Sequence, residues 1–116
     1  MIRIVLIVGS TDELIGIEAR GHANCGTLGN DPVCAAVSFL LRTVALYLGD
    51  ACTAQAESRG TFSLNVNKGF VEKNQDYKTE KLLRLRFISS FIQTGINSLV
   101  KEYPDSVELS IKNSKE

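Results

Sequence analysis

The chain's only histidine and one of its three cysteines lie close together in the sequence, and both are residue types used by thiol hydrolases. His22 stands in Gly21-His22-Ala23, and Cys34 stands in Asp31-Pro32-Val33-Cys34-Ala35-Ala36-Val37-Ser38. A thiolate can attack an acyl carbon, and an imidazole can hold the displaced proton and later return it. We therefore predict that Cys34 is a nucleophile and that His22 is its general base and acid.

Cys34 lies in what we expect to be the first turn of a helix spanning Pro32 to about Leu48. Asp31 is a favoured N-cap, and Pro32 suits the first helical position because its missing N–H would be unbonded there. Unpaired N–H groups and the positive end of the helix dipole favour a thiolate at this place. The N–H groups at and around Cys34 are also candidate donors to an oxyanion.

Each of these residues also has a plain structural interpretation. A cysteine among helical alanines is commonly a small buried hydrophobe, and a lone histidine is commonly a surface residue. Asp31 admits three roles: an N-cap, a third catalytic group that orients His22, or a negative charge that opposes the thiolate. Ser38, one turn after Cys34, could donate to the thiolate or to a substrate, although a helical serine more often bonds its own backbone.

The segment between His22 and Asp31 is rich in glycine and asparagine, a composition typical of a flexible loop. Such a loop can open for a peptide and close around it. We expect a lid or substrate loop whose residues include Gly21, Ala23, Gly26 and Gly29.

Length, charge and cysteine content limit the possible functions. The 116 residues suit one domain, 1–116, and the 13 basic and 13 acidic side chains leave no basic surface, so we expect no direct binding to nucleic acid. Cys25, Cys34 and Cys52 show neither a disulfide framework nor a zinc-ligand pattern. We therefore expect a reducing compartment, no metal and no cofactor.

The apolar run Ile2–Val8 is too short for the core of a signal peptide, and we find no segment that we expect to span a bilayer. The sequence therefore predicts a soluble, cytoplasmic protein that does not interact with membranes.

Apolar periodicity predicts the element order β-β-α-β-β-α-β, which is an α+β fold with an antiparallel or mixed sheet of about five strands and two helices. Ile2–Val8 is apolar at both parities, so we expect it to be covered on both faces. Residues 50–59 are ambiguous and would allow a helical turn, and Thr79 is a candidate cap of the second helix. The expected strands are 2–8, 14–22, 61–67, 70–73 and 106–112, and the expected helices are 32–48 and 80–102.

The second predicted helix has a broad apolar surface. Phe87 and Phe91 are most simply core residues, and with Leu83 they widen the apolar stripe beyond what one sheet face usually needs. We therefore expect a homodimer.

Gly21-His22-Ala23, a glycine-containing loop and Asp31-x-Val33-Cys34-Ala35-Ala36-Val37-Ser38 together resemble the signature of the bacterial ribosomal-processing cysteine proteases. The resemblance extends over nearly the whole chain, with Pro32 in place of an expected aliphatic residue. It implies an endopeptidase that trims an N-terminal extension from large-subunit ribosomal protein twenty-seven, with Cys34 and His22 forming and resolving a thioester acyl-enzyme. It also implies that the substrate is the N-terminal segment of that ribosomal protein and that the enzyme is a homodimer.

Two other functions are consistent with the same residues. The chain could be a non-catalytic dimeric module that binds ribosomal proteins or assembly intermediates, with Cys34 merely buried. It could also be a cysteine hydrolase of another peptide substrate, which would share the catalytic residues and differ only in what it cleaves.

Overall fold

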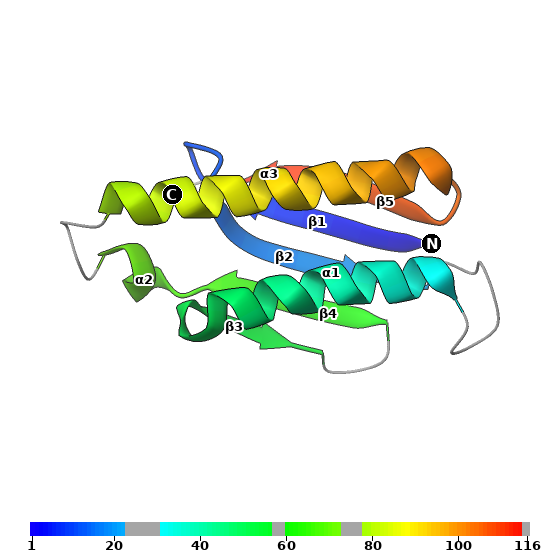
Figure 1. The fold of residues 1–116 in the computed structure, drawn as a ribbon, viewed down its shortest axis with the longest axis horizontal. Coiled ribbons are helices and arrows are strands. Elements are labelled where there is room, and N and C mark those ends of the chain that lie inside the picture. Colours follow the sequence, from blue (N-terminus) through cyan, green and yellow to red (C-terminus); the bar gives the residue numbers. More distant parts are fainter. Residues whose placement is uncertain (23–30, 57–59, 73–77, 115–116) are drawn as a thin grey trace.

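The computed structural model describes residues 1–22, 31–56, 60–72 and 78–114. Five strands form one mixed sheet in the order β3-β4-β2-β1-β5, and the two long helices, α1 and α3, lie side by side across one face of it (Figure 1). The α+β class that the sequence predicted is confirmed.

The strands pair mostly with antiparallel neighbours, and within the described ranges the one parallel pair is β1 with β5. In chain order the elements are β1 (Ile2–Val8), β2 (Leu14–Arg20), α1 (Pro32–Leu48), the 3₁₀ turn η1 (Gly49–Ala51), β3 (Cys52–Gln55), β4 (Thr61–Val66), α2 (Lys68–Glu72), α3 (Lys78–Glu102) and β5 (Val107–Asn113).

The first helix has the predicted bounds, but the second predicted hairpin is wrong. Residues 68–72 form α2, and β4 pairs instead with β3 from the ambiguous segment. Asn67 accounts for the change, because its backbone N–H donates to the Ala51 carbonyl and its side-chain amide donates to the Asp50 carbonyl, at 2.8 and 2.9 Å. These bonds tie the end of β4 to the start of β3. Thr79 is not a cap, since α3 begins at Lys78.

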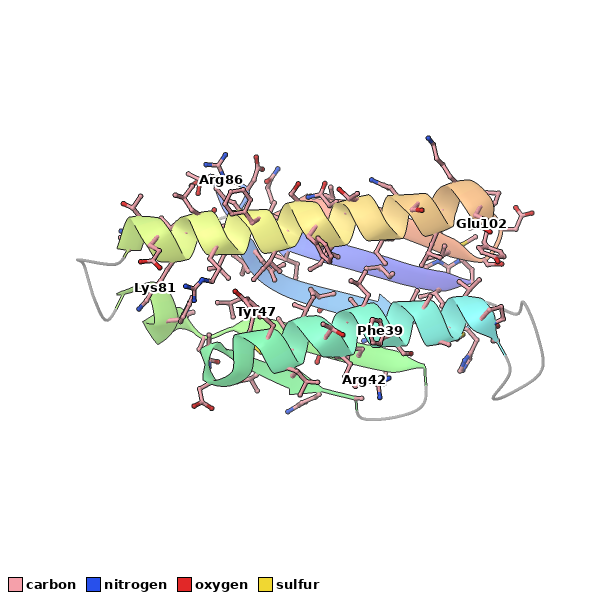
Figure 2. The ribbon with its side chains drawn as sticks, in the orientation of Figure 1. Phe39, Arg42, Tyr47, Lys81, Arg86 and Glu102 are labelled. Atoms are coloured by element: carbon pink, nitrogen blue, oxygen red, sulfur yellow. The ribbon has the colours of Figure 1, made fainter. Side chains whose placement is uncertain are left out.

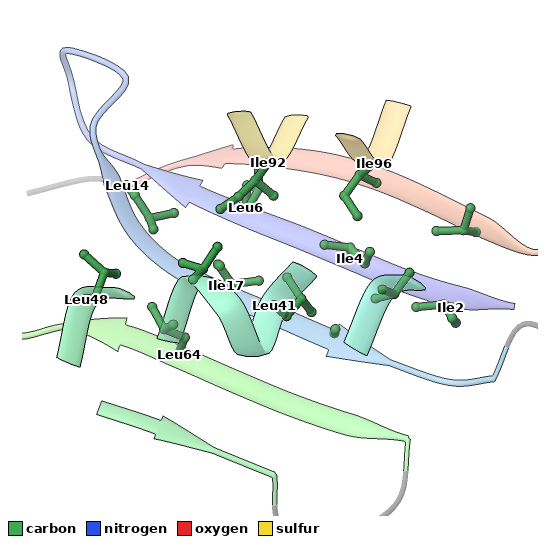
Figure 3. Close-up of a cluster of buried hydrophobic side chains, with 14 of the residues drawn as sticks. Ile2, Ile4, Leu6, Leu14, Ile17, Leu41, Leu48, Leu64, Ile92 and Ile96 are labelled. Atoms are coloured by element: carbon green, nitrogen blue, oxygen red, sulfur yellow. The ribbon is translucent and has the colours of Figure 1, made fainter. Parts of the chain in front are cut away.

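The core lies between the two long helices and the face of the sheet that they cover (Figure 3). Strand residues that alternate toward this face are buried, most of them at most 1% exposed, and they meet buried residues of α1 and α3. The main members are Ile4, Leu6, Ile17 and Leu64 from the sheet and Leu41, Ile92 and Ile96 from the helices.

The other face of the sheet is polar, so the expectation that β1 is covered on both faces is wrong. Arg3 is exposed on this face and its guanidinium pairs with the Glu108 carboxylate of β5 at 3.4 Å. Val5 and Ile7 are only half-buried. The apolar residues at both odd and even positions of β1 therefore reflect its central place in the sheet, and not a covering layer on each face.

One stretch, Pro32–Ala51, is long and apolar enough to cross a membrane by length and composition, with a mean hydropathy of 1.6, which corrects the sequence-based expectation. The core helix of a soluble protein passes the same test. Val33, Val37, Leu41, Val44 and Leu48 of α1 are buried in the core, and 28% of the apolar stretch as a whole is buried.

The outer surface of the helical layer carries exposed apolar side chains. Phe87 and Phe91 are 73% and 68% exposed, so their assignment to the core is wrong. They lie four residues apart on the side of α3 opposite Leu85 and Ile92, where helical periodicity turns them away from the sheet. We call this surface the outer helical face, made by Phe39, Leu46 and Tyr47 of α1 and Leu83, Phe87 and Phe91 of α3. Figure 2 labels Phe39 and Tyr47 on α1.

We predict that Ile4→Ala lowers the free energy of unfolding by about 3 kcal/mol, because it leaves a cavity under both helices. The matched control is Ile111→Ala on the neighbouring β5, where the side chain is 49% exposed, and it should cost only about 1 kcal/mol. Urea unfolding followed by circular dichroism measures both. Equal losses would show that the core does not lie where the structure places it.

Candidate active site

Cys34 lies in the first turn of α1, as the sequence predicted. Asp31 is the N-cap, and one of its carboxylate oxygens accepts hydrogen bonds from the N–H groups of Val33 and Cys34, each at 3.0 Å. Its backbone carbonyl accepts from the N–H of Ala35 at 3.0 Å. The capping role of Asp31 is thereby confirmed, and it holds the backbone of Cys34 directly.

The same cap occupies the backbone donors that we expected for an oxyanion. An oxyanion formed at Cys34 has to displace the Asp31 carboxylate from the Val33 and Cys34 N–H groups or take donors from other residues.

The Cys34 side chain is half-buried at the edge of the core cluster, whereas the next residue toward the N-terminus, Val33, is fully buried. Val33 therefore anchors the first turn while the thiol stays partly accessible. Ser38 is exposed one turn further along. A supporting role for Ser38 stays a prediction.

His22 lies two residues after the end of β2 and is exposed. The strand end that carries it is held by a hydrogen bond from the Gly21 N–H to the Gly60 carbonyl at 2.8 Å. Gly21 has φ +103°, and a side chain there would overlap the Met1 carbonyl oxygen. Glycine is therefore needed at position 21 to close the strand beside the N-terminus.

The end of β2 and the start of α1 lie at the same end of the molecule (Figure 1). The fold thus brings the backbone positions before His22 and around Cys34 to one region, although they belong to different layers. Ala23, Gly26 and Gly29 of the predicted lid lie outside the described residues. The orienting role of Asp31 toward His22 and the lid role of Gly21 stay predictions.

Cys52 is distinct from Cys34 in its surroundings. Its sulfur lies 3.7 Å from the carbonyl oxygens of Ala45 and Gly49, at the opposite end of α1. Burial raises the pKa of the Cys52 thiol, so at neutral pH it is held more firmly as the unreactive thiol. This makes Cys52 an internal reference for thiol chemistry.

Sequence reasoning missed Gly60, whose backbone lies against the imidazole of His22. The sequence shows only a glycine that ends a polar segment before a strand. The contact depends on the pairing of β2 with β4, with Arg20 opposite Thr61. A glycine immediately before a strand that pairs with the histidine-bearing strand is the signal that could have found it.

A comparison with known protein families identifies the family of this chain. The family model described as cysteine protease Prp matches residues 1–108. The chain belongs to this family. It is a cysteine protease, and the role of Cys34 as its nucleophile stays a prediction.

Solved structures share the Prp fold over nearly the entire chain. The ribosomal processing protease Prp from S. aureus, with a covalently linked product peptide, has a TM-score of 0.70 at 20% identity, covering 97% of this chain and 100% of that chain. The same protein with a substrate peptide has a TM-score of 0.69 at 19% identity, with the same two coverages. SMU.848 from Streptococcus mutans has a TM-score of 0.71 at 26% identity, covering 98% of this chain and 96% of that chain.

A comparison with curated protein sequences finds no match. At the identities of the two S. aureus structures, the structural likeness shows the fold alone. Family membership rests on the sequence match over residues 1–108.

The N-cap generates a prediction about stability. Asp31→Ala should lower the free energy of unfolding by about 1 kcal/mol, because the Val33 and Cys34 N–H groups lose their acceptor. Asp31→Asn is the matched control, and it should stay near the native value because asparagine caps as well as aspartate. Thermal and urea unfolding of the two variants would contradict the cap if both lost the same amount.

Proposed function

We propose that this cysteine protease is an endopeptidase of ribosome biogenesis that acts in the cytoplasm and removes a short N-terminal extension from large-subunit ribosomal protein twenty-seven. The main support for the proposal is the family match over residues 1–108. In addition, Cys34 lies in the first turn of α1, at the end of the molecule where β2 ends shortly before His22. The S. aureus relative, a ribosomal processing protease that binds a substrate peptide, supports the substrate class.

In the proposed reaction, the Cys34 thiolate attacks the scissile carbonyl carbon and forms a tetrahedral intermediate. When the C–N bond breaks, the His22 imidazolium gives its proton to the leaving amine, and the acyl group remains on sulfur as a thioester. His22 then takes a proton from water, and the resulting hydroxide attacks the thioester. The acyl fragment leaves as a carboxylic acid, and the thiolate and imidazolium are restored.

We propose that the substrate peptide lies along the sheet edge formed by β3. The buried residues of α1 and its contact with α3 leave Cys34 on the side of the helix turned toward β3 and β4, and β3 is an edge strand. Edge strands offer unpaired backbone groups that can bind an extended peptide. Thr53, Ala54 and Gln55 on this edge are exposed, which leaves the edge accessible.

The cleavage test uses the precursor of the ribosomal protein from the same organism. The native chain should shorten the precursor by an N-terminal fragment in an intact-mass measurement, and Cys34→Ala should abolish the cleavage because the nucleophile is gone. Cys52→Ala is the matched control, since its sulfur lies at the opposite end of α1, and it should retain cleavage.

Binding of the precursor without cleavage by the native chain would favour the non-catalytic module instead. Cleavage of unrelated peptides in preference to the precursor would favour another peptide substrate. Cleavage that persists in Cys34→Ala would assign the chemistry to a different residue.

We also propose a homodimer, with the outer helical face as the surface between the two copies. Taking about 200 Å² for a whole aromatic side chain, its four aromatic residues, 65–73% exposed, present roughly 550 Å². Leu46 and Leu83 add to this area, which approaches the ~800 Å² that each partner buries in a standard interface. A two-fold axis through this face would let the same apolar residues pack on themselves.

We predict that Phe87→Glu converts the dimer to a monomer, because a carboxylate cannot be buried unpaired between two apolar faces. Analytical ultracentrifugation at micromolar concentration measures the mass. The control is Ser110→Glu, which adds the same charge at an exposed position on the polar face of the sheet and should leave the dimer intact. A native chain that sediments as a monomer would remove the proposal.

A further inference from the structure

Gly60 lies directly against the imidazole of His22. A Cβ built on Gly60 would stand 2.8 Å from Nε2 and 2.9 Å from Cε1 of His22, closer than real Cβ atoms approach other atoms. The imidazole therefore occupies the space that any other side chain at position 60 would take. The contact involves the ring edge that carries one of the two nitrogens available for proton transfer.

The backbone of Gly60 is itself held in place at this point. Its carbonyl accepts the hydrogen bond from the N–H of Gly21, the residue before His22. The next residue, Thr61, begins β4 and pairs with Arg20 of β2. The imidazole thus lies against the end of a strand that is paired with the strand preceding His22.

We propose that Gly60 is a positioning residue for His22. Because Gly60 has no side chain, the imidazole can lie against the start of β4. The inference rests on the proposed function, in which His22 is the base and acid for Cys34. A side chain at position 60 would displace the imidazole from this position. Displacement of a reacting group by about 1 Å can cost ~100-fold in rate.

A turn that merely needs glycine does not account for this contact. Gly60 has φ +87°, which disfavours other residues, but Gly49 at the end of α1 also has a positive φ, +53°. A Cβ on Gly49 would meet nothing within 4 Å. Both glycines satisfy a backbone requirement, and of these two only Gly60 also makes room for the imidazole.

The first measurement uses the native protein. His22 is the only histidine in the chain, so its ring resonances need no further assignment. A nuclear Overhauser effect between the His22 Hε1 proton and the Gly60 Hα protons is expected, because the ring carbon Cε1 faces Gly60. Absence of this effect in the folded chain would overturn the proposal without any variant.

The second measurement compares Gly60→Ala with Gly49→Ala. Both introduce a Cβ at a residue of positive φ, so both are expected to lower the melting temperature. Only Gly60→Ala should move the His22 ring resonances and slow the alkylation of Cys34 by iodoacetamide relative to Cys52, by ~10- to 100-fold. Equal ring shifts and equal alkylation rates in the two variants would overturn the proposal.

A third comparison separates this inference from the proposed function. In a His22→Ala background, Gly60→Ala should cause no further loss of Cys34 alkylation or of precursor cleavage, because the ring it positions is gone. A further loss there would show that Gly60 acts by another route and overturn the proposal. If Gly60→Ala shifts the His22 ring resonances while His22→Ala leaves cleavage unchanged, Gly60 does position the imidazole, but His22 is not catalytic.

Discussion

The burial of the apolar stripe of α1 against the sheet is the interaction on which the candidate site depends. Val33, fully buried, comes immediately before Cys34, and Leu41 and Leu64, at most 2% exposed, continue the contact between α1 and the sheet. Because Val33 cannot leave the core without exposing its side chain, the first turn of α1 has one place on the sheet. The half-buried thiol of Cys34 then stands at the end of the molecule where β2 finishes.

The atoms that stabilise the start of α1 also lie at the candidate active site. The Asp31 carboxylate satisfies two N–H groups that would otherwise be unbonded, which stabilises the helix. The same bonds occupy the Val33 and Cys34 N–H groups, so these two donors cannot bind a developing oxyanion while the cap is in place. If an oxyanion used these two donors it would have to displace the Asp31 carboxylate, and the local stability of the helix would then be linked to the rate of reaction.

The two faces of the molecule have different surfaces because only one face of the sheet is covered by α1 and α3. The uncovered face places Arg3 opposite Glu108 and remains polar, as expected for strands that meet water. The outer helical face instead exposes Phe87 and Phe91, whose side chains are 73% and 68% exposed. Dimerisation through that face would leave the end with Cys34 and the polar sheet face accessible.

Local signals in the sequence were enough to determine α1 from Pro32 to Leu48, its Asp31 cap and the place of Cys34, because capping and helical periodicity act between residues within a few positions of one another. The pairing of β4 with β3 and the exposure of Phe87 were decided only by tertiary structure, since both depend on which distant segments are already in contact. The contact between the His22 imidazole and Gly60 was likewise decided only by the tertiary structure. It exists because β2 and β4 pair at their ends, and the missing side chain matters only once that pairing brings the imidazole there.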